Sequence, residues 1–253
     1  MSVSEEYRVD LHVKVLDEAV VSRAKRVGLN ALVYAPHFTP LDRIERTASE
    51  YADDDLDVIP AREIFTGSWA NRKHVLALDL DSPIPDFISL STAVDECVRQ
   101  NAVILVPHPT FATVSLGESE LRTYHHAIDG IELFNPKHLP FHNRRASRLA
   151  DRLDLPGFAS SYAHIGRTVG AAWTAFEAVD GPESLSDALR TGGPRTVTHQ
   201  RGAARVATTM TELAHLGWEN TWTKAKRLLR PDRVPTHPGN RRYRGRFDDG
   251  AVY

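Results

Sequence analysis

The sequence has few of the features that mark secreted or membrane proteins. Its 253 residues include a single cysteine, Cys97, so no internal disulfide can form. No apolar run approaches the roughly 20 residues that span a bilayer, and residues 1–6 are polar and acidic, unlike a secretory leader. These absences predict a cytoplasmic protein with no membrane partner. Cys97 falls in a predicted helix, where a buried structural thiol is favoured over a nucleophile.

The composition is otherwise that of an ordinary globular protein, with 42% hydrophobic and 25% charged residues. The length allows one large α/β domain or two small ones. The net charge is −2, but the charge is unevenly distributed. Residues 223–246 form a basic segment with nine Lys or Arg and one acid, Asp232. Such a segment can bind a polyanion such as nucleic acid, or it can lie back on an acidic body or stay solvated. We favour the second interpretation.

Strand-like and helix-like segments alternate over the first 200 residues. Strands are predicted at residues 7–14, 31–37, 56–64, 73–80, 102–108, 130–135, 156–164, 169–176 and 195–199, and helices at 17–28, 40–53, 91–101, 142–154, 184–191 and 205–229. This alternation predicts βαβ units and a parallel sheet, either closed into a barrel or open. The connections are too short to hold a second domain before residue 200.

The first predicted strand, residues 7–14, has two different faces. Its apolar residues alternate with Asp10, His12 and Lys14, which is the period-two pattern of a strand. This strand alone leaves two interpretations open: the polar face lines a site, or it belongs to a solvated edge strand.

Further histidines and a glutamate lie where other predicted strands end or begin. The carboxyl ends of parallel strands share one rim in a barrel and one crevice in an open sheet, so residues distant in sequence converge there. Imidazole and carboxylate without thiolate suit catalytic zinc, iron or manganese. Paired ions bridged by a carboxylate favour displacement at phosphorus. The predicted metal ligands are His12, His37, Glu63, His74, His108 and His164.

In their order and spacing these segments resemble the polymerase and histidinol phosphatase (PHP) family. Asp-Leu-His-Val-Lys at residues 10–14 is similar to the family's opening Asp-Leu-His-x-His motif. The similarity runs in order from about residue 7 to 177, through residues 28–37, 58–64, 74, 106–109, 131–135, 160–164 and 169–170. The resemblance implies an α/β fold of the PHP type, a distorted TIM-like (β/α)7 barrel. We place this barrel at residues 5–200 and a C-terminal helical, basic extension at 201–253.

The resemblance also implies an activity, the hydrolysis of a small phosphate ester or nucleotide by a metal-bound hydroxide. In the family pattern one ion would be bound by His12, Glu63 and two further ligands, a second by Glu63, His74 and His108, and a third by His37, His164 and a nearby acid. This sequence departs from the pattern at two of the first ion's ligands, where Lys14 replaces a histidine and Tyr162 an aspartate. We therefore expect two divalent ions, of zinc, manganese or iron, rather than three.

The two departures can be interpreted in opposite ways. Lys14 could neutralise Glu63 or hold a phosphate oxygen, with Tyr162 as a hydrogen-bond donor to the same phosphate. Alternatively the site has decayed into an inactive metal-binding scaffold, because an ammonium repels neighbouring metals. Arg167 could also hold a phosphate, or it could be a surface residue. We favour a phosphoric ester hydrolase, with nucleic-acid association through residues 223–246 as a further alternative.

Other polar residues are weaker candidates for the site. Arg62 is expected on the opposite face of the strand from Glu63. Glu132 could line the pocket or pair with an arginine. The four histidines at positions 125, 126, 138 and 142 fall in predicted loops or a helix and are expected to be exposed.

Overall fold

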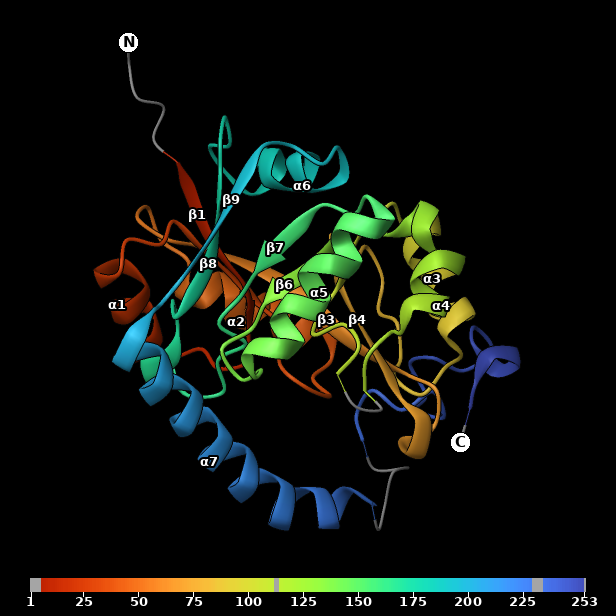
Figure 1. The fold of residues 1–253 in the computed structure, drawn as a ribbon. Helices are drawn as coiled ribbons and strands as arrows, with labels where there is room; N and C mark the ends of the chain where they lie inside the picture. Colours follow the sequence, from red (N-terminus) through yellow and green to blue (C-terminus); the bar gives the residue numbers. More distant parts are fainter. Residues whose placement is uncertain (1–5, 112–113, 229–233, 253) are drawn as a thin grey trace.

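The computed structural model describes residues 6–111, 114–228 and 234–252. Within them the chain has a mixed α/β fold, in which one nine-stranded sheet curls nearly into a barrel with helices around it (Figure 1). The strand order is β7-β6-β5-β4-β3-β2-β1-β8-β9, and β7 at one end contacts β8 and β9 at the other. The predicted barrel-like α/β fold is therefore confirmed. None of the described helices is long and apolar enough to cross a membrane.

The predicted helices and strands are all found, with ends shifted by a few residues. The strands are β1 (Tyr7–Val13), β2 (Ala31–Tyr34), β3 (Asp57–Thr66), β4 (Lys73–Leu78), β5 (Val103–Val106), β6 (Gly130–Phe134), β7 (Gly157–Ala159), β8 (Ala172–Phe176) and β9 (Arg195–His199). The helices are α1 (Glu18–Arg26), α2 (Leu41–Tyr51), α3 (Leu90–Arg99), α4 (Glu118–Thr123), α5 (Pro140–Leu153), α6 (Pro182–Arg190) and α7 (Gly202–Leu228). The short helix α4 was not predicted.

The prediction of a parallel sheet is wrong for half of the strand pairs. Pairs β1–β2, β2–β3, β5–β6 and β6–β7 are parallel, whereas β3–β4, β4–β5, β1–β8 and β8–β9 are antiparallel. Only residues 67–72 connect β3 to β4, which is too short for the crossover that a parallel pair requires. As a consequence, the beginning of β4 lies beside the end of β3. His74 is paired with Phe65, and this brings it next to Glu63.

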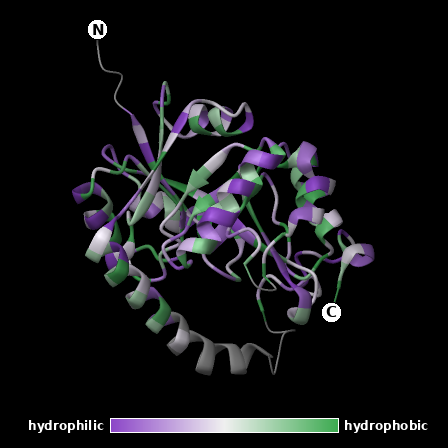
Figure 2. Ribbon diagram, in the orientation of Figure 1, coloured by the Kyte–Doolittle hydropathy of each residue, from purple (hydrophilic) through white to green (hydrophobic). Residues whose placement is uncertain are grey.

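Apolar residues inside and outside the sheet hold the barrel. Leu11, Val33 and Leu105, from three different strands, belong to one cluster that the curled sheet encloses. Outside the sheet, helices α1, α2 and α5 turn their apolar sides inward and their polar sides outward, so both kinds of residue alternate along α5 in Figure 2. Val20 of α1, for example, is fully buried.

A local irregularity in β1 changes which of its residues face inward. Pairing with β2 shifts in register between Asp10 and Val13. Leu11 lies in the cluster inside the barrel, but Val13 packs in the cluster that contains Val20 and Ala24 of α1. Such irregularities re-aim side chains, and here the change of face accompanies a His12 side chain that is directed at Glu63.

Residues 234–252 return from α7 to the body of the barrel beside α3 (Figure 1). The N–H of Ser89 donates to the carbonyl of Gly250 at 2.7 Å, and Thr236 donates to Asp86. Tyr243 and Phe247 are buried in the same apolar cluster as α3. The boundary at residue 200 stays a prediction.

Two arginines of the basic segment pair with acids of the body. Arg242 Nη1 lies 2.9 Å from Asp42, and Arg246 Nη2 lies 3.2 Å from Glu96. For these two residues the chain lies back on an acidic surface, as the favoured interpretation of the segment predicted. Residues 229–233 of the segment lie outside the described part of the chain.

Candidate metal centre

Glu63 of β3 is the centre of the candidate site. Its side chain is fully buried, and its two oxygens face different partners. Oε1 lies 3.1 Å from His74 Nδ1, 3.2 Å from His108 Nε2 and 3.8 Å from His12 Nε2. Oε2 lies 2.6 Å from Lys14 Nζ and 2.7 Å from His37 Nε2. Four of the predicted metal ligands, all histidines, and Lys14 therefore converge on the carboxylate of a fifth, Glu63.

The opening strand is central in the sheet, between β2 and β8, and Asp10, His12 and Lys14 are buried. The edge-strand interpretation is thus wrong. Asp10 accepts the N–H of Ser161 at 2.8 Å and that of Gly170 at 2.9 Å, which ties β1 to the chain after β7. Burial raises the pKa of Asp10 to about 6. Asp10 therefore anchors the strand, while His12 and Lys14 reach Glu63.

The ligand atoms of Glu63, His74 and His108 suit a metal ion, since they all lie within 4.8 Å of one another and all three residues are buried. Neutral imidazole and carboxylate are the ligands of zinc, manganese and iron in such sites. Within the described residues, both ring nitrogens of His12 and Nε2 of His74 are buried without a hydrogen-bond partner. Buried polar atoms seldom remain unsatisfied, so the donor set fits a cation.

The tautomer of His108 supports the same conclusion. Ser115 has one hydroxyl hydrogen, which is directed at the carbonyls of His108 and Phe111. Its oxygen must therefore accept from His108 Nδ1, 3.1 Å away, so that the lone pair of Nε2 faces Glu63 Oε1. Two acceptors that face each other favour a cation between them. Fixing one ring nitrogen through a second residue is also how metal-binding histidines are oriented.

The charges of the site favour neutral histidines and an ionised Glu63. Burial, followed by the charge of Lys14, lowers the pKa of His37 to about 3, and burial lowers that of His74 to about 4. Burial alone would raise the pKa of Glu63, but the charge of Lys14 holds it well below its usual range. Burial lowers the pKa of Lys14 to about 8, against the attraction of Glu63. At neutral pH Lys14 is therefore mainly an ammonium.

His164 is at the same rim, but its ring nitrogen contacts a different residue. Lys137 Nζ lies 2.5 Å from His164 Nδ1, and the carbonyl of Tyr162 lies 3.0 Å from the same nitrogen. Lys137 also lies 3.2 Å from Glu212 Oε2 of α7 and 4.1 Å from the centre of the Tyr162 ring. The rings of His164 and His37 are 5.4 Å apart.

Lys137 and Glu212 were not anticipated from the sequence. Lys137 is in a loop that follows Asn135-Pro136, and Glu212 is in the middle of a long helix. Neither is at the end of a predicted strand, and neither lies in a segment that resembles the PHP family. Their convergence depends on where α7 lies relative to the barrel.

Tyr162 lies between the two ammonium groups, and Arg167 lies apart from them. The Tyr162 ring is 4.6 Å from that of His12, and Lys14 Nζ is 5.5 Å from its centre. Tyr162 has φ 47° and His108 has φ 33°, which costs a non-glycine residue about 1–3 kcal/mol. Arg167 is exposed. The proposed roles of Lys14, Tyr162 and Arg167 stay predictions.

Three of the weaker candidates are also placed by the structure. Arg62 Nη2 lies 3.1 Å from Asp86, so it points away from the site as expected. Glu132 accepts the backbone N–H of His108 at 2.7 Å and thereby supports the loop that carries this histidine. The expectation that His138 is exposed is wrong, because its ring stacks on Phe111 and burial lowers its pKa to about 3.

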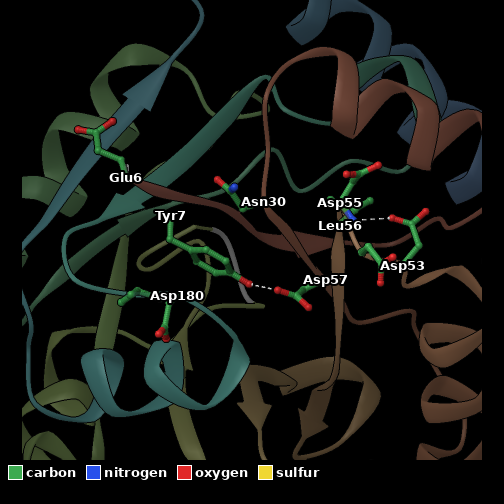
Figure 3. Close-up of a pocket in the computed structure, with 10 residues that line it drawn as sticks. Glu6, Tyr7, Asn30, Asp53, Asp55, Leu56, Asp57 and Asp180 are labelled. Carbon is green, nitrogen blue, oxygen red and sulfur yellow. Dashed lines mark hydrogen bonds between the residues drawn. The ribbon is translucent and has the colours of Figure 1, made fainter. Parts of the chain in front are cut away.

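A separate cavity of about 350 Å³ lies near the beginning of β1, the end of the strand opposite Lys14 (Figure 3). It is lined by Tyr7 and by several acids, and the Tyr7 hydroxyl donates to Asp57. Lys25 pairs with Asp53 at its edge, at 2.6 Å. None of the predicted metal ligands lines this cavity.

Comparison with known proteins supports the PHP resemblance. Residues 140–194 match a family described as PHP-associated. No curated protein matches the chain. A solved structure with a similar fold is PsfC from Pseudomonas syringae PB-5123, with 19% identity, coverage of 83% of this chain and 98% of that chain, and a TM-score of 0.63.

Two further structures have the same fold. One is a two-domain protein from Bacteroides vulgatus ATCC 8482 containing a predicted PHP-like metal-dependent phosphoesterase, with 16% identity, 83% and 71% coverage and a TM-score of 0.59. The other is an amidohydrolase from Chromobacterium violaceum with bound sulfate and no metal, with 15% identity, 77% and 99% coverage and a TM-score of 0.54. At these identities the likeness concerns the fold.

Proposed function

Because the chain has a PHP-type fold and a PHP-associated segment, we propose that it is a divalent-metal-dependent hydrolase of small phosphate esters. The observation that carries this proposal is the buried group of Glu63, His74 and His108, whose ligand atoms lie within 4.8 Å of one another at the barrel rim. The solved neighbours include proteins described as a PHP-like phosphoesterase and an amidohydrolase, so hydrolysis is the reaction class they support.

The two oxygens of Glu63 divide the site into a metal side and an ammonium side. Oε1 faces His12, His74 and His108, whereas Oε2 faces Lys14 at 2.6 Å. A carboxylate can bridge two cations, and here we propose that it bridges one metal ion and one ammonium. Lys14 Nζ also donates to the carbonyl of Ala35 at 2.5 Å, which fixes its position.

A metal held at Oε1 would supply Lewis acidity and lower the pKa of a bound water. Lys14 would orient Glu63 and keep a positive charge beside the reacting phosphoryl group. Tyr162, between Lys14 and Lys137, would limit the space open to the substrate. The neutral histidines would leave their lone pairs free for the metal.

We propose one ion per chain, fewer than the two expected from the sequence. The second expected position involves His37 and His164. The Lys137 ammonium lies 2.5 Å from His164 Nδ1, and its charge opposes a cation there. Zinc, manganese and iron all suit the proposed ligands.

A second candidate function is a metal-binding scaffold without turnover. It is favoured by the ion pair itself, since Lys14 already neutralises Glu63 on one side. A nucleic-acid role for residues 223–246 has less support, because Arg242 and Arg246 pair with acids of the barrel. Such a role predicts that removing residues 223–253 weakens polynucleotide binding and its salt dependence; equal binding by both chains would exclude it.

The experiment for the proposed function combines metal analysis with a panel of phosphomonoesters and nucleotides assayed with Mn²⁺. Wild type is compared with His74→Ala and with His126→Ala, an exposed histidine away from the site. We expect about one ion per chain and turnover in wild type and His126→Ala, and loss of both in His74→Ala. Bound metal without turnover, with turnover gained by Lys14→His plus Tyr162→Asp, would instead establish the scaffold.

A further inference from the structure

Helix α7 lies on the barrel with a polar face inward. Among residues 202–215, only the side chains of Thr208 and Glu212 are buried. Val206, Met210 and Leu213 are 62%, 63% and 42% exposed, and α7 runs along the outer edge of the molecule (Figures 1 and 2). A surface helix normally buries its apolar stripe. The described part of α7 is thus held mainly by polar contacts.

The deepest of these contacts is the carboxylate of Glu212, which is fully buried. Oε1 accepts the backbone N–H of His164 at 3.2 Å and the hydroxyl of Thr168. Oε2 lies 3.2 Å from the ammonium of Lys137. All three donors belong to the barrel, whereas the carboxylate comes from a separate element. Together, an ammonium, a backbone N–H and a hydroxyl are the donors that proteins use to bind oxyanions.

These donors also have partners outside α7, although Thr209 of α7 donates to the carbonyl of Pro136, next to Lys137. The Lys137 ammonium is held by His164 Nδ1 at 2.5 Å and by the Tyr162 ring at 4.1 Å. The chain before His164 is joined to the end of β1, where Lys14 N–H donates to the Ala163 carbonyl at 2.9 Å. Thr168 Oγ1 also lies 2.7 Å from the carbonyl of Ile165, which can accept its single hydrogen when Glu212 does not. If α7 moved away, these contacts within the barrel would still hold the three donors near one another.

We propose that Lys137, His164 N–H and Thr168 form an oxyanion subsite and that Glu212 fills it as an internal ligand, which an anionic group of the substrate or product displaces. This inference rests on the proposed function for the identity of the ligand, a phosphoryl group. The subsite adjoins the candidate metal centre, because the His164 and His37 rings are 5.4 Å apart and Tyr162 lies beside both Lys137 and Lys14. Displacement of Glu212 releases α7 from the rim.

The test measures binding of inorganic phosphate to the full chain by calorimetry, together with hydrogen exchange of residues 202–215. We compare wild type with Glu212→Gln and Lys137→Met, and use exposed Glu45→Gln as the matched charge control. Glu212→Gln removes the internal competitor's charge, so phosphate should bind about tenfold tighter or more, whereas Lys137→Met should lose binding. In wild type, phosphate should accelerate exchange in residues 202–215.

The inference is overturned if folded Glu212→Gln binds phosphate no tighter than Glu45→Gln, or if saturating phosphate leaves exchange of residues 202–215 unchanged in wild type. The second measurement decides alone if Glu212→Gln does not fold. Both are repeated in His74→Ala, which lacks a proposed metal ligand. If phosphate still accelerates hydrogen exchange of α7 in this variant, the result supports the subsite independently of metal chemistry. If phosphate no longer does so, phosphate binds through the metal and the proposed subsite is overturned.

Discussion

Replacing Lys14 by methionine is the most informative change at the candidate centre. Methionine keeps much of the side-chain volume but removes the ammonium that lies 2.6 Å from Glu63 Oε2. Without metal, the variant leaves a buried carboxylate that has lost its cation. Breaking a buried ion pair in this way costs about 3–5 kcal/mol of folding free energy.

The effect on metal binding has the opposite sign. An ion on the Oε1 side would lie roughly 5–6 Å from the ammonium, judged from usual metal–oxygen distances. At an effective dielectric constant of about 20, the repulsion between a divalent ion and an ammonium is about 6 kcal/mol at that separation. Relaxation and water reduce this figure. We therefore expect Lys14→Met to bind Mn²⁺ or Zn²⁺ about tenfold tighter or more.

Two assays measure these effects. Competition with a fluorescent chelator gives the metal dissociation constant, and thermal unfolding with and without metal gives stability. Lys25→Met is the matched control, because Lys25 pairs with Asp53 at the opposite end of β1. The variant should be less stable than wild type in chelator and should recover most of that loss with metal. Equal metal affinity in Lys14→Met and Lys25→Met would refute the proposal that one oxygen of Glu63 binds a metal ion while the other pairs with the Lys14 ammonium.

Three further predictions concern metal, pH and the tail. Protein with metal at 100 times its dissociation constant should be more stable than chelator-treated wild type by about 2.7 kcal/mol. Chelator should leave the unfolding temperature of His74→Ala unchanged. Equal effects of chelator on the two proteins would exclude the proposed metal site. The pKa of His138 is lowered by burial to about 3, below the unfolded value near 6.5, so its contribution to stability is complete above pH 6.5 and is lost as pH falls toward 3. Between pH 6 and 4, the free energy of unfolding of metal-free wild type should therefore fall by up to about 1.4 kcal/mol per pH unit more than that of His138→Phe. Urea titrations at several pH values measure this difference. If the two proteins lose stability equally as the pH falls, His138 does not contribute. Arg242→Ala removes a partly exposed ion pair and should change stability by less than about 1 kcal/mol; a larger loss would mean that the tail depends on this pair.

The sequence predicted the order of helices and strands well, because period-two and period-3.6 patterns are local properties. It did not predict strand direction. The antiparallel β3–β4 pair depends on a six-residue connection at 67–72, whose sequence does not indicate the direction of the next strand. The same pair brings His74, the only predicted ligand at the beginning of a strand, to Glu63.

At the site, the residues near strand ends were predictable because such ends gather at one rim. Lys14 was identified through a departure from a motif, and its contact with Glu63 is compatible with both alternatives considered, a working site and a decayed one. Lys137 and Glu212 could not be identified in this way. Their positions depend on a loop and on the docking of α7, and both are tertiary properties that no local pattern encodes.

We propose that Glu63 holds a metal ion through Oε1 and the Lys14 ammonium through Oε2. This proposal is tested most directly by a crystal structure of metal-loaded protein, with anomalous diffraction recorded at the absorption edge of the bound element. We expect a single anomalous peak in contact with Glu63 Oε1, His74 and His108, with Lys14 Nζ still beside Oε2. No peak at this position, or a peak where the Lys14 ammonium now lies, would contradict it.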